Sequence, residues 1–178
     1  MGYDNQSRAD KSNDNKKRII ACALALIDEK GFDNVSVREI TEAAGVSKGA
    51  FYIHFKSKED LIERQISLFY DEFKLDDSKP KFERLSYFLF QSLKHIQQAG
   101  LRMCQEWFSH SIKGSFYGKT KLSYDLKAIA AIVEDQALAE EIVSVYYGAL
   151  NLWCFTDGTI APEPTIAQYL NDMKEKLL

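Results

Sequence analysis

The chain has 178 residues, of which 46% are hydrophobic and 28% are charged, a balance typical of a globular protein and not of a disordered one. Its formal net charge of -3 excludes a uniformly basic surface, so any binding of nucleic acid depends on where the charges lie. No apolar run approaches the roughly 18 residues that span a bilayer, and residues 1–17 lack the apolar core of a secretory signal, so we expect a cytoplasmic protein with no membrane partner.

Cysteines and histidines give no sign of a metal site. Cys22, Cys104 and Cys154 lie far apart, each inside an apolar helical stretch, which favours buried thiols over a disulfide or metal ligands. The three histidines form no ligand spacing with them. No spaced carboxylate pair, nucleophile–base signature or phosphate-binding loop is visible either. We therefore expect no catalytic residue, no metal and no other cofactor.

Apolar spacing predicts helices along the whole chain after a polar, disordered tail at residues 1–14. About nine helices are expected, and they span residues 15–30, 36–44, 47–54, 58–73, 81–98, 101–113, 124–133, 138–155 and 165–178. Glycines at positions 114 and 118 are expected to bracket a turn. The predicted fold class is all-α, with a first domain at residues 15–60, a connecting helix at 58–73 and a second helical domain at 74–178.

Paired capping signals mark two helix starts within residues 31–61. Ser36 and Ser57 are each followed three residues later by an acid, so each serine can accept a bond from a first-turn N–H while the acid reaches back towards the cap. Gly45 stands where the preceding helix has to end in a left-handed residue. Two short helices around a glycine turn are the layout of a helix-turn-helix, whose second helix lies in the DNA major groove.

The charge distribution also favours DNA binding by this segment. Residues 1–60 hold ten basic and ten acidic residues, whereas residues 61–178 carry the net charge of -3. Residues 46–58 contain three lysines and one histidine but no acid. A small positive face on a neutral domain is sufficient for local phosphate contacts, and the acidic remainder discourages indiscriminate binding.

Nineteen positions agree in type and spacing with a known signature: Gly31-Phe32, Val35-Ser36-Val37, Ile40, Ala44-Gly45-Val46-Ser47, Gly49, Phe51-Tyr52, His54-Phe55, Ser57-Lys58-Glu59 and Leu61. In these residues the chain resembles the N-terminal part of the TetR family of transcriptional regulators. The resemblance covers about residues 15–73. Thr41 departs from it, because the family usually has alanine there, and we expect slightly altered packing. Residues 74–178 resemble the family only in being helical.

The resemblance implies a set of residues that contact double-stranded operator DNA. Phosphate contacts are implied for Tyr52, His54 and Lys58, and contacts to phosphates or base edges for Ser36, Ser47 and Lys48. Arg38 matches a position from which some family members reach a base, and guanine is the natural partner of a guanidinium. Gly49 lets the helix backbone approach a phosphate or base closely.

Structural alternatives remain open for several of these residues. Tyr52 can instead be a half-buried packing residue, and His54 a cap or a solvent-exposed side chain. Arg38 can instead be solvated, or pair with Glu42 four residues further on. The serines already have a structural role as caps, so any contact with DNA is additional.

Aromatic and sulfur-containing residues are concentrated between residues 87 and 124, and they can line a cavity for an apolar or aromatic small molecule of unknown identity. Our candidates for ligand contacts are Met103, Trp107, Phe108 and His110, the last as a polar group in apolar surroundings. The alternative is that most of these residues are simply core.

The two C-terminal helices carry more apolar residues than one face requires. The resemblance implies that they form a four-helix interface between two copies, and a helix-turn-helix needs two-fold symmetry to bind half-sites about 34 Å apart. We therefore predict a homodimer, with Tyr146, Ala149, Trp153 and Leu170 at its interface.

These inferences lead to the hypothesis of a dimeric repressor that leaves a palindromic operator when a small molecule binds the C-terminal domain. The main rival is a regulator that activates transcription, or binds DNA only together with its ligand. A helical small-molecule enzyme is a further rival, although no catalytic motif supports it.

Overall fold

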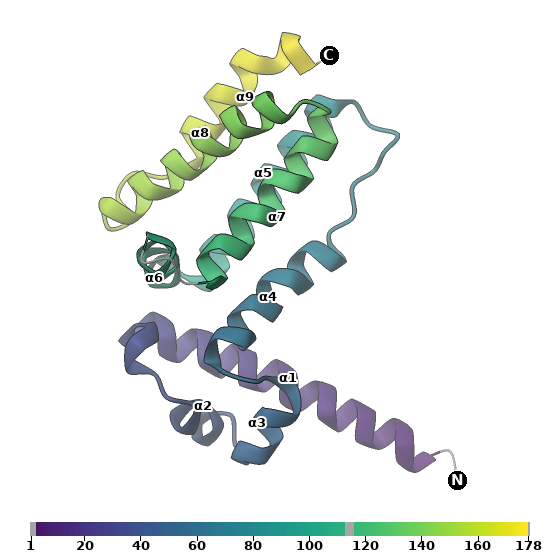
Figure 1. Ribbon diagram of the computed structural model, residues 1–178, viewed down its shortest axis with the longest axis vertical. Coiled ribbons are helices and arrows are strands. Elements are labelled where there is room, and N and C mark those ends of the chain that lie inside the picture. Colours follow the sequence, from purple (N-terminus) through teal and green to yellow (C-terminus); the bar gives the residue numbers. More distant parts are fainter. Residues whose placement is uncertain (1–2, 113–115, 178) are drawn as a thin grey trace. The chain divides into compact units, whose positions relative to one another are not determined.

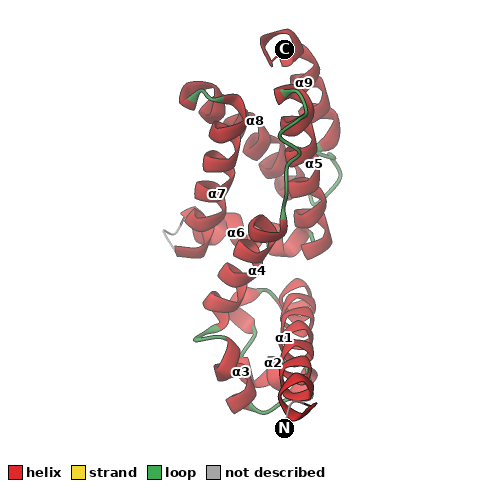
Figure 2. Ribbon diagram, turned by 90° about the vertical axis from the view of Figure 1, so that its right-hand side faces the viewer, coloured by secondary structure: helices red, strands yellow, loops and turns green. Residues whose placement is uncertain are grey.

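The computed structural model describes residues 3–112 and 116–177, and all regular elements in those ranges are helices (Figure 1, Figure 2). Nine α-helices and one short 3-10 helix, η1, follow one another along the described chain. Their bounds are α1 (Tyr3–Lys30), η1 (Phe32–Asn34), α2 (Val37–Ala43), α3 (Lys48–His54), α4 (Lys58–Glu72), α5 (Lys81–Ala99), α6 (Leu101–Ile112), α7 (Phe116–Val133), α8 (Gln136–Phe155) and α9 (Glu163–Leu177). The all-α prediction is confirmed.

The chain divides into two compact units between Gln65 and Ile66. This division falls inside α4, whereas the sequence analysis placed the second domain after residue 73. The first half of α4 therefore belongs to the N-terminal unit and its second half to the C-terminal unit. The charged segment after α4, at residues 73–80, connects two helices of the same unit.

The N-terminal unit is built on one face of α1. Ile19, Ala23 and Ile27 recur every four residues, which puts them on a single side of the helix, and all three are buried. This face packs against α2 and α3, which contribute the buried side chains of Ile40 and Phe51. The packing orients two helices of seven residues each, which are too short to be stable alone.

Four helices begin two or more residues before the expected start. The helix expected from residue 15 begins at Tyr3, so the predicted tail is helical from that residue. No proline or glycine interrupts residues 3–30, and once α1 has formed, each added turn costs little. Likewise α7 begins at Phe116 and contains Gly118, while Gly114 and residues 1–2 lie outside the described residues. Helices α8 and α9 each begin two residues early, at Gln136 and Glu163.

In the C-terminal unit, α8 packs against α6, α7 and α9, and α5 packs against α7 and α9. Helix α8 is apolar on much of its surface, as a helix with neighbours on several sides has to be. Cys104 and Cys154 are buried free thiols in this core, as predicted, whereas Cys22 in α1 is half-buried. No helix in the described part of the chain is long and apolar enough to cross a membrane.

Candidate nucleic-acid interface and buried ion pair

A reciprocal cap starts α2. The Ser36 hydroxyl accepts from the backbone N–H of Glu39 at 3.2 Å, and the Glu39 carboxylate accepts from the backbone N–H of Ser36 at 2.9 Å. Lys30 adds an ion pair to Glu39 at 3.1 Å. The hydrogen bonds from Ser36, followed by that from Lys30, lower the pKa of Glu39 from 4.5 to about 2. The cap that the sequence predicts is confirmed.

This shift predicts a pH dependence of stability. The folded-state pKa of Glu39 lies below its unfolded-state value, so its contribution is fully present above about pH 4.5 and is lost as pH falls towards 2. We expect Glu39→Gln to remove part of the fall in melting temperature over that range, measured by circular dichroism. Glu175→Gln, at an exposed position of α9, is the control. Superimposable curves for Glu39→Gln and the wild type would contradict the prediction.

The turn after α2 depends on Gly45. Its φ of 63° is left-handed, and its backbone follows the end of α2, with the next residue's N–H bonding to Thr41 O at 3.0 Å. A Cβ at Gly45 would meet nothing within 4 Å, so glycine is required there for the backbone conformation and not for space. Ser47 then caps α3 by accepting from Ala50 N at 3.1 Å. The predicted glycine turn is confirmed.

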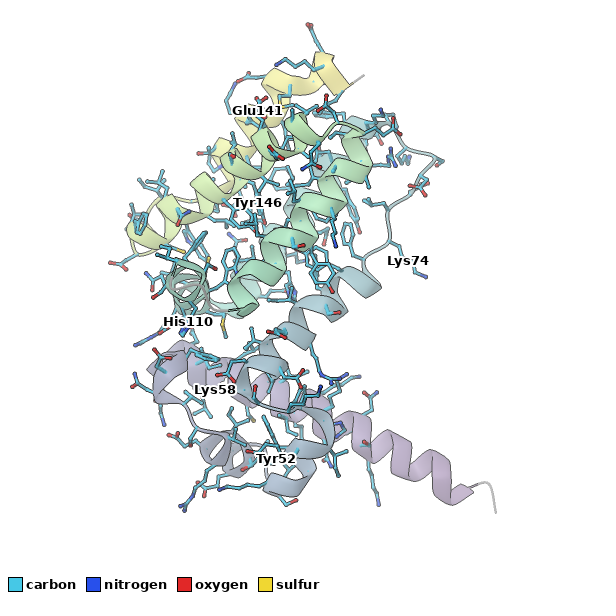
Figure 3. All side chains as sticks on the ribbon, in the orientation of Figure 1. Tyr52, Lys58, Lys74, His110, Glu141 and Tyr146 are labelled. Carbon is cyan, nitrogen blue, oxygen red and sulfur yellow. The ribbon has the colours of Figure 1, made fainter. Side chains whose placement is uncertain are left out.

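Helix α3 has one buried side and one exposed side. Phe51 and Phe55 are buried and anchor the helix, with their ring centroids 5.4 Å apart. On the other side Tyr52 is 57% exposed and Ile53 is 77% exposed. Figure 3 labels Tyr52 in the N-terminal unit. Gly49 lies three and four residues before them, which places all three on the same face.

Ile53 was missed by the sequence analysis because an isoleucine in an amphipathic segment is usually assigned to the core. Its spacing from Gly49 was the available signal. An exposed isoleucine on a helix built for the major groove offers methyl groups to thymine, which carries a methyl group there. Ser47 and Lys48 precede it on the exposed N-terminal turn of α3, so they are accessible as the sequence analysis expected.

His54 and Arg38 are accessible but have partners within the chain. His54 is half-buried, and its Nε2 lies 3.5 Å from Ser12 Oγ of α1. Burial, with smaller contributions from Lys16 and Arg64, lowers the pKa of His54, so its ring is neutral at pH 7 and can contribute a hydrogen bond but no charge. Arg38 Nε pairs with Glu42 Oε1 at 2.7 Å, the alternative noted for this residue.

Lys58, for which a phosphate contact is expected, lies at the start of α4 and bonds within the chain. Its ammonium donates to the carbonyl oxygens of Phe32 at 2.5 Å and Val35 at 2.7 Å, and it lies 4.1 Å from the centroid of the Phe32 ring. A lysine stem is long enough to fold back from the start of α4 onto the end of η1 (Figure 3). Lys58 thus joins α4 to η1, and two of its three N–H donors are used within the chain.

The residues expected to contact a ligand are divided between core and surface. Met103 and Trp107 of α6 are buried, while Phe108 and His110 are half-buried. Trp107 packs against Tyr147 of α8, with ring centroids 5.2 Å apart. These contacts agree with the alternative that most aromatic residues here are core, and a ligand role for the four residues stays a prediction.

A polar cluster that sequence reasoning did not find lies beside Trp107. Lys121 and Asp125, one turn apart on α7, form a buried ion pair with an N–O distance of 2.6 Å. The Asp125 carboxylate also accepts from the hydroxyl of Tyr70 in α4 and, at 2.8 Å, from that of Tyr147 in α8. Lys121 also donates to Ser92 Oγ in α5 at 3.1 Å. The cluster therefore ties α7 to α4, α5 and α8.

Three of the four residues predicted at a dimer interface, Tyr146, Ala149 and Leu170, are buried within the single chain. Their place at an interface stays a prediction. Their apolar spacing marks the inner faces of α8 and α9. Trp153 is half-buried. The exposed apolar residues of α8 are instead Leu152 and Phe155, the latter 80% exposed.

Comparison with known proteins explains the arrangement of the N-terminal unit. The model of the bacterial regulatory proteins of the tetR family matches residues 19–64. The HTH-type transcriptional regulator SAB2452 of Staphylococcus aureus (strain bovine RF122 / ET3-1) is 32% identical over 131 residues, which cover 64% of this chain and 71% of that protein. The chain belongs to the TetR family.

Other family members are similar over very different lengths. The match to the uncharacterized HTH-type transcriptional regulator YerO of Bacillus subtilis (strain 168) is 50% identical over 50 residues, but it spans only 17% of that protein. The negative transcriptional regulator IcaR of the biofilm operon icaADBC of Staphylococcus aureus (strain Newman) is 26% identical over 139 residues, with 74% of this chain and 69% of that protein covered.

A solved structure shares the TetR fold over most of this chain. The fatty acid degradation regulator FadR from Bacillus halodurans superimposes with a TM-score of 0.65 at 20% identity, and the match covers 89% of this chain and 93% of that chain. At this identity the likeness concerns the fold alone.

The departure from the family pattern at Thr41 is accommodated locally, because the threonine is buried and its hydroxyl donates to Arg38 O at 2.9 Å.

Proposed function

We propose that this TetR-family chain is a homodimeric transcriptional repressor that binds a palindromic operator and is released from it by a small molecule. The observation that carries the proposal is the two-sided α3, anchored by buried Phe51 and Phe55 and presenting Tyr52 and Ile53 to solvent. A helix of seven residues with this much exposed aromatic and aliphatic surface needs a partner, and its place after a capped glycine turn suits the major groove.

Within this proposal the DNA-contacting residues fall into three groups. Lys48, Tyr52 and the cap residues Ser36 and Ser47 contact phosphates, and Gly49 lets the backbone come close. Ile53 contacts thymine methyl groups, and Lys48 also reaches a base edge. DNA contacts from Arg38, His54 and Lys58 are secondary, because each of these side chains already has a partner within the chain. The partners are Glu42 for Arg38, Ser12 for His54, and the carbonyl oxygens of Phe32 and Val35 for Lys58.

The dimer of the proposal uses the outer face of α8. Leu152 and Phe155 are exposed there, and a Cβ at Gly148, one turn before Leu152, would meet nothing within 4 Å, so a second helix can approach closely. Two apolar residues beside a glycine on one exposed helix face can pack against the same residues of a second copy in a two-fold symmetric contact. The half-sites of the operator would lie about 34 Å apart.

Helix α4 is the element that couples ligand to DNA in this proposal. Its N-terminal half carries Lys58 and its C-terminal half carries Tyr70, whose hydroxyl joins the buried ion pair. A ligand in the C-terminal unit releases the operator only if it binds the two states of the dimer with different affinity, typically by about 1–3 kcal/mol.

The proposal is tested by gel shift with an operator selected from genomic fragments. We expect Lys48→Ala to weaken binding and to reduce the slope of log affinity against log salt by about 1, since one phosphate contact is lost. It should also change sequence preference. Lys94→Ala, which removes the same charge from an exposed position of α5, is the control. Equal affinities and slopes for the two variants would contradict the assignment of α3.

A ligand-dependent activator or co-repressed regulator is the second candidate, and adding cell extract to the same gel shift separates the two. Retention of DNA only when extract is added would favour a co-repressed or activating protein. The family's members named above are transcriptional regulators, and we propose no enzymatic activity for this chain.

A further inference from the structure

The Lys121 ammonium is surrounded by four aromatic rings. Its Nζ lies 5.8 Å from the ring centroids of Tyr70 and Tyr146 and 5.9 Å from those of Trp107 and Tyr147. Rings at such distances attract a cation through their quadrupoles, and cages of aromatic rings recognise organic ammonium ligands in other proteins. We call these four rings, together with Asp125, the ammonium cage. Its composition is that of a cation-binding site with its own counter-charge.

Of the two charged partners, Lys121 is the one that can leave. Asp125 is 0% exposed, and its short side chain keeps the carboxylate close to the backbone of α7. Lys121 is 6% exposed and carries its ammonium on a flexible four-carbon stem. Such a stem can turn outwards and place its ammonium in water. Exchange for an incoming cation therefore requires less rearrangement of Lys121 than of Asp125.

The hydrogen bonds of Lys121 define the kind of ammonium that fits the cage. Its N–H groups have three acceptors: Asp125 Oδ2 at 2.6 Å, Ser92 Oγ at 3.1 Å and Tyr70 Oη at 3.2 Å. A primary ammonium reproduces all three bonds, whereas a quaternary ammonium has no N–H to donate. An anion is disfavoured because the fixed charge of the cage is a carboxylate.

An open groove of about 460 Å³ adjoins the cage at Tyr70. Its walls include the rings of Tyr70, Phe73, Phe88 and Tyr124, and two charged residues, Asp77 and Lys127, also line it. Tyr70 stacks on Tyr124 with centroids 4.8 Å apart, while its hydroxyl donates to Asp125. Aromatic walls beside a site for one charge suit a ligand that has a hydrocarbon body and a single polar end.

We propose that the ammonium cage is a binding site for primary alkylammonium ligands and that Lys121 occupies it until such a ligand displaces it. The ligand's ammonium takes the three acceptors of Lys121, and its hydrocarbon body lies in the adjoining groove. This inference deepens the proposed function, on which it rests for the effect on DNA, because it names the chemical class of the effector.

Calorimetric titration of the full chain without DNA tests the site. The probes are 2-phenylethylammonium, its neutral analogue 2-phenylethanol, and its N-trimethylated form, which keeps the charge but loses the N–H donors. We expect the primary ammonium to bind about tenfold more tightly than either of the others. Equal binding of 2-phenylethanol, or tighter binding of the trimethylated form, would overturn the proposal.

Variants of Lys121 and Asp125 then test whether the lysine competes with the ligand for the ammonium cage. Lys121→Met removes the competing ammonium and should strengthen binding of 2-phenylethylammonium by about tenfold or more, whereas Asp125→Asn should abolish the preference for charge. Lys94→Met, at an exposed position of α5, should leave binding unchanged. If Lys121→Met does not fold alone, we expect 2-phenylethylammonium and not 2-phenylethanol to restore its fold. Unchanged affinity, or no restoration by the amine, would count against displacement of Lys121.

Failure of this inference and failure of the proposed function give different results. If the chain binds the operator but shows no preference for the primary ammonium, the proposed function stands and the proposed cage site is refuted. If the chain binds the amine but no DNA, the cage site stands and the proposed function is refuted. Amine binding that leaves operator affinity unchanged would overturn the effector role.

Discussion

Asp125→Ala is expected to lower the free energy of unfolding of the C-terminal unit by about 3–5 kcal/mol, because it removes the counter-charge that holds the Lys121 ammonium in its buried position. It also deprives the hydroxyls of Tyr70 and Tyr147 of their acceptor. Urea unfolding followed by near-ultraviolet circular dichroism measures the loss. Asp172→Ala, at an exposed position of α9, should change stability by no more than about 0.5 kcal/mol.

Replacing both charged residues at once tests whether the loss of stability comes from the unpaired charge. The double replacement Lys121→Met with Asp125→Leu puts apolar side chains in place of the ion pair, and it should recover most or all of the lost stability. A double variant as unstable as Asp125→Ala would mean that the pair is needed for more than mutual neutralisation. An Asp125→Ala loss no larger than that of Asp172→Ala would contradict the burial of the pair.

Phe51→Ala is expected to destabilise the N-terminal unit by about 3–5 kcal/mol and to abolish operator binding. The Phe51 ring is fully buried, it packs against Phe55, and its truncation leaves a cavity beneath a helix that cannot hold itself together. Thermal unfolding by circular dichroism, with gel shift on the same samples, measures the two effects.

The neighbouring Tyr52→Ala provides the matched comparison, because Tyr52 is 57% exposed. We expect it to leave stability within about 0.5 kcal/mol of the wild type and to weaken operator binding by roughly tenfold, equally for all DNA sequences. Loss of stability in Tyr52→Ala comparable to that in Phe51→Ala would show that the exposed face of α3 had been misassigned.

Local signals made the N-terminal unit predictable. The cap of Ser36 with Glu39 and the left-handed Gly45 involve residues at most a few positions apart, so their chemistry can be inferred from adjacent letters of the sequence. The burial of Phe51 and Phe55 follows from their spacing by one helical turn. The all-α fold class followed in the same way from apolar periodicity.

Contacts between distant residues explain what the sequence did not reveal. Lys58 folds back onto the carbonyl of Phe32, 26 positions earlier, and no local pattern distinguishes that from a lysine directed at solvent. Helix α8 is apolar on several sides, so periodicity could not tell its inner face, with Tyr146, from its outer face, with Leu152. The Lys121–Asp125 pair looked like an ordinary exposed pair one turn apart, because its aromatic surroundings come from other helices.

The hydrogen bond of Tyr70 also constrains which changes of length α4 tolerates in evolution. One residue inserted between Phe69 and Tyr70 would turn Tyr70 by about 100° around the helix axis relative to Phe69 and move it by about 1.5 Å along that axis. The stacking of Phe69 on His95 and the hydrogen bond from the Tyr70 hydroxyl to Asp125, both within the C-terminal unit, could then not both be kept. Insertions and deletions among related sequences should therefore be rare within the second half of α4 and common in the segment at residues 73–80 that follows it.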